Sequence, residues 1–304
     1  MASNAGPRAI KQRPVRVLMH IVLLVGVLVA IFPFLWMIAT AFKSYSEVAR
    51  GIWIPDRLRY WNFAEAWNAA PFARYFFNSF FIAACTIAGV LFTSILAGYA
   101  FGRLEFFGKN VIFILFLATM MIPFEVTMIP NFIIVRRIYE VLHVSPPALP
   151  LFGYTLLGQA KTGWYNSYAA MIVPWTASVF SIFLFRQFFA TIPNDLYDAA
   201  ILDGCSHRRF LIEIVLPLSR PAIVAVVLFT FLGSWNAFTW PLIITSSEVM
   251  RPITVGLSFF ITDAGTDTQL LMAASTLTIL PIIILYFFAQ KEFIEGIAST
   301  GLKG

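Results

Sequence analysis

The chain has 304 residues, of which 60% are hydrophobic and 12% are charged, about half the charged share of a typical soluble domain. Charged side chains supply much of the contact between a folded surface and water, so this composition argues against a soluble enzyme, a disordered chain and a nucleic-acid binder. The net charge of +6 comes from basic residues scattered between apolar blocks, as in the loop anchors of membrane proteins. We predict a polytopic membrane protein embedded in the lipid bilayer, with no nucleic acid as partner.

Six long apolar blocks lie between the charged residues of the chain. Each exceeds the roughly 20 residues that a helix needs to cross the hydrocarbon layer. Continuous apolar runs such as residues 21–31 lack the alternation of barrel strands, so the spans are predicted to be helices and the fold all-α. The six predicted spans cover residues 17–42, 75–102, 110–135, 162–185, 221–247 and 268–290.

A seventh uncharged block, residues 141–160, is also long enough to cross a membrane. It contains Pro146, Pro147 and Pro150, which remove backbone donors and break helices. We therefore predict a loop or an interfacial segment there.

The orientation of the spans follows from the charges at the N-terminus. Residues 1–16 carry four basic residues and no acid, which places this segment in the cytoplasm by the positive-inside rule. An even number of spans returns the C-terminus to the same side. Residues 17–304 are then one transmembrane domain, and residues 186–220 are its longest polar segment on the cytoplasmic side.

The segment 186–220 is predicted to form two short helices at an angle. Asp195 suits the first turn of a helix, and Gly204 can take the left-handed conformation that ends one. Ser206 can cap the second helix, which Pro217 is expected to end. Two interpretations remain open at this point: a hairpin lying on lipid headgroups, or a docking element received by a groove of another protein.

The spacing within this segment matches a known signature. Asp198-Ala199-Ala200, three residues, Gly204, nine residues and then Ile214-Val215-Leu216-Pro217 resembles the Glu-Ala-Ala…Gly…Ile-x-Leu-Pro signature of the permease subunits of bacterial ABC importers. Asp198 departs from the signature's Glu, which keeps the charge and shortens the arm. The resemblance implies the type I permease fold and an ATPase-docking loop with the site residues Asp198, Ala199, Ala200, Gly204, Ile214, Leu216 and Pro217. Packing against a neighbouring helix remains the alternative for the two alanines, and simple helix termination the alternative for the proline.

Further motifs look like those of the maltose-type carbohydrate permeases. More specifically, they are similar to the smaller, second permease of the pair, which also occurs in glycerol-3-phosphate importers. The outer segment at 141–165 is longer than usual for that family. The motifs that carry this resemblance are Pro33–Met37, Asn78-Ser79, Ala97–Arg103, Met121–Pro130, Leu216–Ala222 and Ser234–Leu242.

The resemblance implies a non-catalytic subunit of an ATP-driven importer for a sugar or oligosaccharide in a bacterial or archaeal cell membrane. Its implied partners are a second homologous permease that completes a heterodimer, two ATPase subunits and an external solute-binding protein. The chain has no Gly-x-x-x-x-Gly-Lys-Ser/Thr phosphate loop, so ATP and Mg are expected on the partner ATPase and no cofactor on this chain. Cys85 and Cys205 have no partner at ligand spacing, so no metal is expected.

The predicted substrate pathway rests on four residues. Glu125 is the only acid well inside an apolar block, where an ionised side chain is costly unless it is paired or wet; a hydrogen bond to backbone freed by nearby prolines is the alternative. Trp235, Asn236 and Phe238 combine an amide with aromatic faces, which suits sugar binding, and packing against the partner permease is their alternative. A permease for glycerol-3-phosphate or another polyol, and a secondary transporter using Glu125, remain rival functions.

Overall fold

The computed structural model describes residues 8–142, 150–151, 154–156, 163–263 and 265–301. The chain divides into two compact units, residues 1–69 with 260–278 and residues 70–259 with 279–304. Helix α16 (Thr268–Gly301) has residues in both units. Each unit is described by itself.

The described residues contain four helices that are long and apolar enough to cross a membrane. Two further pairs of helices pass the same test together but are sharply bent, Lys109–Thr119 with Phe124–Arg136 by 97° and His207–Leu218 with Arg220–Trp235 by 79°. If each bent pair is one span, the described part of the chain has up to six. The four candidate spans are Arg16–Ala41, Phe72–Arg103, Tyr168–Ala190 and Thr268–Gln290, and the third has a short break between Trp175 and Val179.

The first unit joins a long apolar helix to short polar elements. Asn62 donates from Nδ2 to the carbonyl oxygens of Ala41 and Lys43, both at 2.8 Å. These two bonds satisfy carbonyl groups that the end of a helix leaves without partners, so they fix the chain where α1 ends. The elements of this unit before α16 are α1 (Arg8–Ala41), α2 (Tyr45–Ala49), α3 (Trp61–Ala69) and the strands β3 (Ile261–Thr262) and β4 (Gly265–Thr266), which pair antiparallel.

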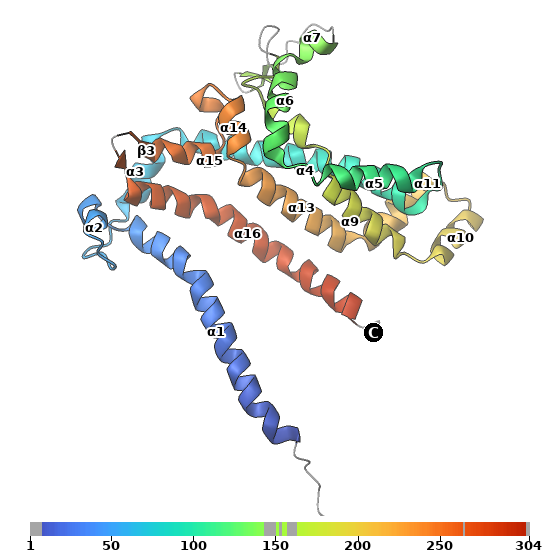
Figure 1. Ribbon diagram of the computed structural model, residues 1–304, viewed down its shortest axis with the longest axis horizontal. Coiled ribbons are helices and arrows are strands. Elements are labelled where there is room, and N and C mark those ends of the chain that lie inside the picture. The colour runs from blue at the N-terminus through green and yellow to red at the C-terminus, as the bar shows by residue number, and fades with distance from the viewer. Residues whose placement is uncertain (1–7, 143–149, 152–153, 157–162, 264, 302–304) are drawn as a thin grey trace, which may run out of the picture. The chain divides into compact units, whose positions relative to one another are not determined.

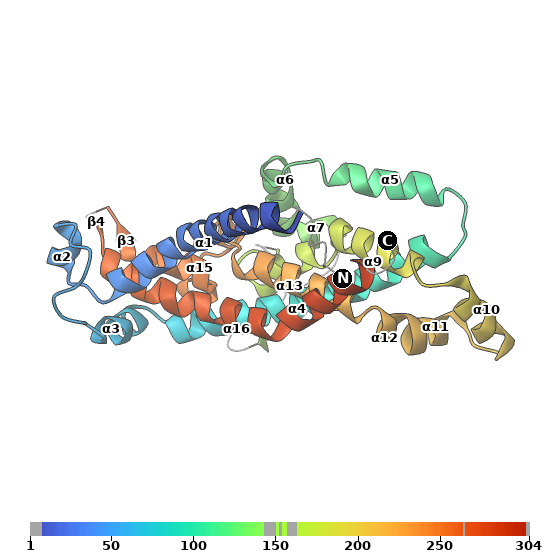
Figure 2. The ribbon, with the colours of Figure 1, turned by 90° about the horizontal axis from the view of Figure 1, so that it is seen from below.

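The core of the second unit is a layer of three long helices, α4 (Phe72–Arg103), α9 (Val179–Ala190) and α13 (Arg220–Trp235), which lie side by side in Figures 1 and 2. Helix α4 approaches α9 through Gly98 and Gly102. A Cβ added at Gly98 would lie 2.6 Å from Cβ of Phe185, and one added at Gly102 would lie 3.3 Å from the carbonyl oxygen of Arg186. The two glycines, four residues apart, therefore permit close contact between the helix backbones.

The remaining elements of the second unit surround this layer. Asn78, fully buried in α4, donates to the carbonyl oxygens of Val249 and Arg251, and Ser79 accepts from the backbone N–H of Ile253. These bonds fix the segment before α15 against α4. The other elements are α5 (Lys109–Thr119), α6 (Phe124–Arg136), α7 (Ile138–Leu142), β1 (Pro150–Leu151), β2 (Tyr154–Thr155), α8 (Tyr168–Ile172), η1 (Val173–Trp175), α10 (Asn194–Leu202), α11 (His207–Phe210), η2 (Leu211–Val215), α12 (Leu216–Leu218), α14 (Thr239–Ile244), η3 (Glu248–Met250), α15 (Ile253–Gly256) and η4 (Leu257–Phe260).

Three helices differ from the spans predicted from sequence. The block 110–135 is not one straight helix, because the chain turns before Pro123, which has no N–H to continue α5. The block 162–185 becomes helical only from Tyr168, and its helical part consists of α8, η1 and α9 and ends at Ala190. In the block 221–247, α13 ends at Trp235 and α14 follows as a separate short helix.

The predicted loop at 141–160 lies mostly outside the described residues. Within the part that the structure describes, Pro150–Leu151 and Tyr154–Thr155 form a two-residue antiparallel pair.

Candidate functional site

The segment between α9 and α13 forms a helical hairpin, defined here as residues 194–218, at one end of the three-helix layer and away from α14 and α15 (Figures 1 and 2). Helix α10 ends before Gly204, whose φ of +75° is in the left-handed region. Ser206 then caps α11, its hydroxyl accepting from the backbone N–H of Arg209 at 3.4 Å. The predicted left-handed conformation of Gly204 and the predicted cap at Ser206 are confirmed.

The second half of the hairpin is one helix from His207 to Leu218 with a π-helical turn, η2, in its middle. The prediction that Pro217 ends this helix was wrong, because Pro217 lies inside α12 and the chain turns only after Leu218. The turn η2 directly precedes Leu216 and Pro217, and such a turn changes the hydrogen-bond register. Pro217 is therefore included in the helix, and its ring is exposed.

The hairpin has one buried face and one exposed face. Ala200 is only 7% exposed and packs in a core cluster with Phe210 and Val215, against which Ile214 and Leu216 are half-buried. This cluster continues into α4, α9 and α13. The signature residues on the exposed face are Asp198, Ala199, Gly204 and Pro217.

The exposed face carries charges that find few partners within the chain. Arg209 forms an ion pair with Glu213 at 2.9 Å along its own helix. The structure gives the side chains of Asp195, Asp198 and Asp203 no hydrogen bond or ion pair with any described residue. With small residues beside them, these carboxylates form a surface that a second protein can approach closely.

A cavity of about 790 Å³ opens between α4, the junction of α5 and α6, η1 with α9, and α13 with α14. Its wall is mostly apolar and includes the aromatic residues Phe124, Trp175, Phe180, Phe229, Phe238 and Trp240. Hydroxyl groups interrupt this surface, among them Thr230 and Ser234, which lie one turn apart on α13. The described residues that line the cavity include no Lys, Arg, His, Asp or Glu.

Of the four residues predicted to line the substrate pathway, Phe238 lines the cavity and the other three do not. Trp235 is 0% exposed and packs against Phe80 with ring centroids 4.8 Å apart and against Phe231 at 5.3 Å. Asn236 is exposed at the end of α13.

Glu125 is also apart from the cavity wall. It is exposed in the first turn of α6, where the helix dipole favours an acid. Its neighbour Phe124 is the residue that reaches the cavity.

Sequence reasoning missed two groups of residues. Thr230 and Ser234 belong to an apolar block in which nothing marks them as cavity-lining. Tyr99 and Arg103 were noted only as parts of a motif, although they contact the hairpin from the end of α4, Tyr99 at His207 and Arg103 at Asn194. Their spacing of four residues, which places both on one helix face, was the available signal. The described residues contain no cluster of His, Cys, Asp or Glu able to hold a metal ion.

The second unit thus combines apolar helices, a hairpin with exposed carboxylates and a cavity with hydroxyl groups between the helices. The model of the family described as "Binding-protein-dependent transport system inner membrane component" matches residues 89–297. The chain belongs to this family, and it is therefore a multi-pass membrane permease.

Similar proteins come from several bacteria. The arabinooligosaccharides transport system permease protein AraQ of Halalkalibacterium halodurans is 33% identical over 91% of this chain and 92% of its own. The sn-glycerol-3-phosphate transport system permease protein UgpE of Yersinia pestis is 31% identical over 95% and 98%. A solved chain from a bacterial ABC transporter involved in the import of the acidic polysaccharide alginate has the same fold, with a TM-score of 0.77, 19% identity and coverage of 93% and 98%.

Proposed function

We propose that this permease imports a neutral sugar or oligosaccharide in an ATP-driven complex with a second homologous permease, two ATPase subunits and an external solute-binding protein. Family membership supports a role in binding-protein-dependent transport. The names of the relatives support a carbohydrate or a polyol phosphate as cargo. ATP and Mg are then held by the ATPase, and this chain carries no cofactor and performs no hydrolysis.

The character of the cavity favours a neutral sugar over a phosphorylated polyol. A phosphate group in a low-dielectric site needs cationic or strong hydrogen-bond donors to replace its water. The described lining residues supply hydroxyls and aromatic faces but no basic side chain. Because the lining also lacks an acid and Glu125 lies off the wall, a proton-coupled secondary transporter is less well supported.

The hairpin is the proposed docking element for the ATPase. Asp198, Ala199, Gly204 and Pro217 are exposed together on it, and this is the observation that carries the proposal. Movement of the ATPase would reach the spans through the buried face of the hairpin. The hairpin is then on the cytoplasmic side, and the even number of spans predicted from sequence puts both chain termini on that side as well.

Reconstitution tests the proposal. The chain is expressed with its neighbouring permease and an ATPase subunit, and the membrane complex is purified through this chain. We expect the ATPase to co-purify, and proteoliposomes with the external binding protein to take up a neutral sugar only with ATP inside. Uptake driven by a proton gradient without the ATPase, or uptake of glycerol-3-phosphate in preference to sugars, would contradict the proposal.

The pathway proposal is tested on the cavity wall. Replacing Thr230 and Ser234 together by Ala is expected to lower sugar uptake about thirtyfold, since each of the two lost hydroxyl bonds contributes about 1 kcal/mol. Asn236→Ala is the matched variant, because Asn236 is on the same helix end but not on the wall. If Asn236→Ala changes the preference across a sugar panel and the double variant does not, the pathway follows the sequence-based candidates instead.

A further inference from the structure

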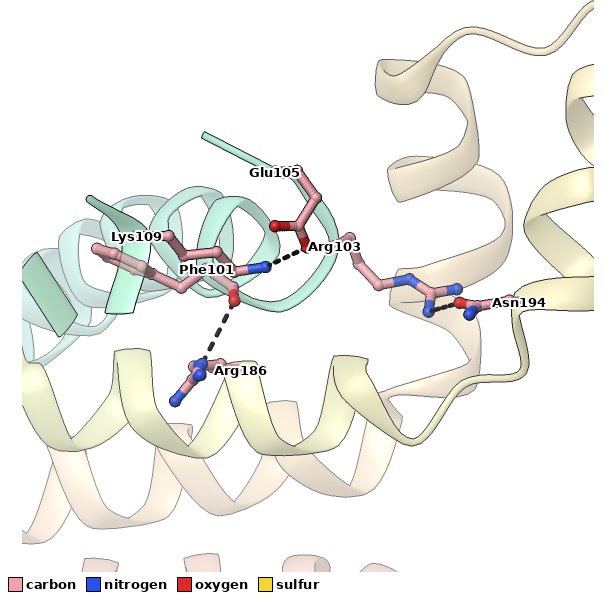
Figure 3. Close-up of polar contacts among 6 residues, drawn as sticks. All are labelled: Phe101, Arg103, Glu105, Lys109, Arg186 and Asn194. Carbon is pink, nitrogen blue, oxygen red and sulfur yellow. Dashed lines mark hydrogen bonds and ion pairs between the residues drawn. The ribbon is translucent and has the colours of Figure 1, made fainter. Parts of the chain in front are cut away.

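The last turn of α4 is bonded to the linker that leads into the hairpin. Arg103 donates from Nη1 to the carbonyl oxygen of Ile192 at 3.0 Å and to Oδ1 of Asn194 at 2.9 Å, and from Nη2 to the carbonyl oxygen of Pro193 at 3.4 Å. Figure 3 shows the guanidinium group reaching across to Asn194. One side chain of α4 therefore contacts three consecutive residues, two in the linker and the first of α10.

A second contact from α4 reaches the other half of the hairpin. The hydroxyl of Tyr99, one turn before Arg103, is 3.1 Å from Nδ1 of His207 in α11. The hydroxyl of Tyr197 in α10 is 3.2 Å from Nε2 of the same imidazole, and the two rings stack. His207 therefore connects both helices of the hairpin to α4.

The covalent connections alone would leave the hairpin free to pivot. It enters through the residues Thr191–Pro193 between α9 and α10, and it leaves after Leu218 with a bend of 79° toward α13. Thr191 and Ile192 are bonded back to the end of α9, whereas Pro193 has no backbone N–H to donate. Arg103 bridges this joint, with its guanidinium over the ring of Phe210 at 5.8 Å.

Helix α4 is in turn fixed to α9. Gly98 and Gly102 allow backbone contact between the two helices, and Arg186 donates from Nε to the carbonyl oxygen of Phe101 at 3.3 Å, as Figure 3 also shows. A displacement of the hairpin that is transmitted to the end of α4 is thus shared with α9. Close-packed helices of this kind move as a body rather than deform.

We infer that Arg103, assisted by Tyr99, is a positioning residue that holds the docking hairpin rigidly to α4, so that ATPase movement is converted into movement of the spans. This inference rests on the proposed function of the hairpin. Without the contacts of Arg103 and Tyr99, here called the clamp, the hairpin would still bind the ATPase through its exposed face. The apolar contacts of Ala200, Phe210 and Val215 would still hold its buried face, but part of the motion would be lost at the joint, and less substrate would be transported per ATP hydrolysed.

The test measures transport per ATP hydrolysed in the reconstituted complex. Arg103→Met removes the donors and keeps much of the apolar stem; we expect the ATPase to co-purify and hydrolyse ATP, while transport per ATP falls about tenfold. Arg103→Lys keeps the positive charge but not the planar, forked set of guanidinium donors, so its transport per ATP should lie between that of Arg103→Met and that of wild type. Glu105→Gln is the control and should leave the ratio unchanged, because the exposed carboxylate of Glu105 lies near the same end of α4 and pairs with Lys109 rather than with the hairpin (Figure 3).

Two outcomes overturn the inference. One is an assembled Arg103→Met complex with the wild-type ratio. If that variant does not assemble, the double variant Tyr99→Phe with Asn194→Ala decides, since it removes one hydroxyl and one exposed amide. A fall of its ratio by about threefold supports the clamp, and an unchanged ratio rejects it. A wild-type complex that binds no ATPase would instead reject the proposed function.

Discussion

Two short helical regions of this permease both begin with a serine cap, but they differ in whether their other polar side chains are hydrogen-bonded within the region or exposed. In the first unit, Ser44 caps α2; in the second, Ser206 caps α11 of the hairpin. The segment around Ser44 closes its hydrogen bonds internally. The hairpin presents carboxylates and small residues outward.

The internal network of the first region centres on Glu47. Its carboxylate accepts from the hydroxyl of Ser44 at 2.7 Å, from the backbone N–H of Ser44 at 2.6 Å and from that of Asp56 at 2.9 Å. These bonds lower the pKa of Glu47 to about 2. A carboxylate with this many donors fixes the loop that contains it, and it has little capacity left for a partner.

The hairpin differs because its packing and its charges are on separate faces. Apolar side chains such as Phe210 hold it to the unit core, so the exposed face does not need internal ion pairs for stability. Charges without internal partners on a well-packed element indicate a binding surface more strongly than charges in a closed network. Three substitutions test this difference.

The largest effect is expected for Gly204→Val. The left-handed φ of +75° has open space around it, so the obstacle is the backbone conformation, which is strained by about 1–3 kcal/mol for a β-branched residue. Uptake should be abolished while the protein remains in the membrane. Gly204→Asn is the control, because Asn tolerates this conformation; normal uptake by the Val variant would remove Gly204 from the docking site.

An intermediate effect is expected for the charge at Asp198. Asp198→Lys should weaken ATPase binding to the purified permease about tenfold, since a hydrogen bond to a charged group contributes about 1.5–3 kcal/mol. Asp198→Glu restores the residue typical of the signature and should bind at least as well as wild type. Equal binding by all three proteins would mean that this carboxylate does not face the ATPase.

The smallest effect on transport is expected for Glu47→Gln, which should leave uptake unchanged and lower the melting temperature by about 2–4 °C. The folded-state pKa of Glu47 is below its ordinary value of 4.5, so its stabilisation is complete above about pH 4.5 and is lost as the pH falls toward about 2. The difference between wild type and variant should therefore shrink over this range. A difference that grows on acidification would contradict the assigned network.

Some features of the hairpin could be predicted from the sequence and others could not. The turn at Gly204 and the cap at Ser206 were predictable because both depend on local backbone chemistry. The end of the second hairpin helix was not, because no local motif announces the π turn before Leu216 and Pro217, in which Leu211 and Val215 are buried in the unit core. The buried position of Trp235 was equally invisible, since α13 is apolar on all sides.

The sequence by itself determined that the protein is embedded in the lipid bilayer, that its fold is helical, which family it belongs to and where the hairpin with the signature lies. These follow from the length of the apolar blocks, the positions of the charges and the spacing of the motif, which are properties of the linear chain. The tertiary structure decided which side chains line the cavity and which fix the hairpin to α4. Thr230 and Phe124 line the same cavity, and Arg103 is hydrogen-bonded to Asn194. Residues so far apart in the chain become neighbours only when the helices pack.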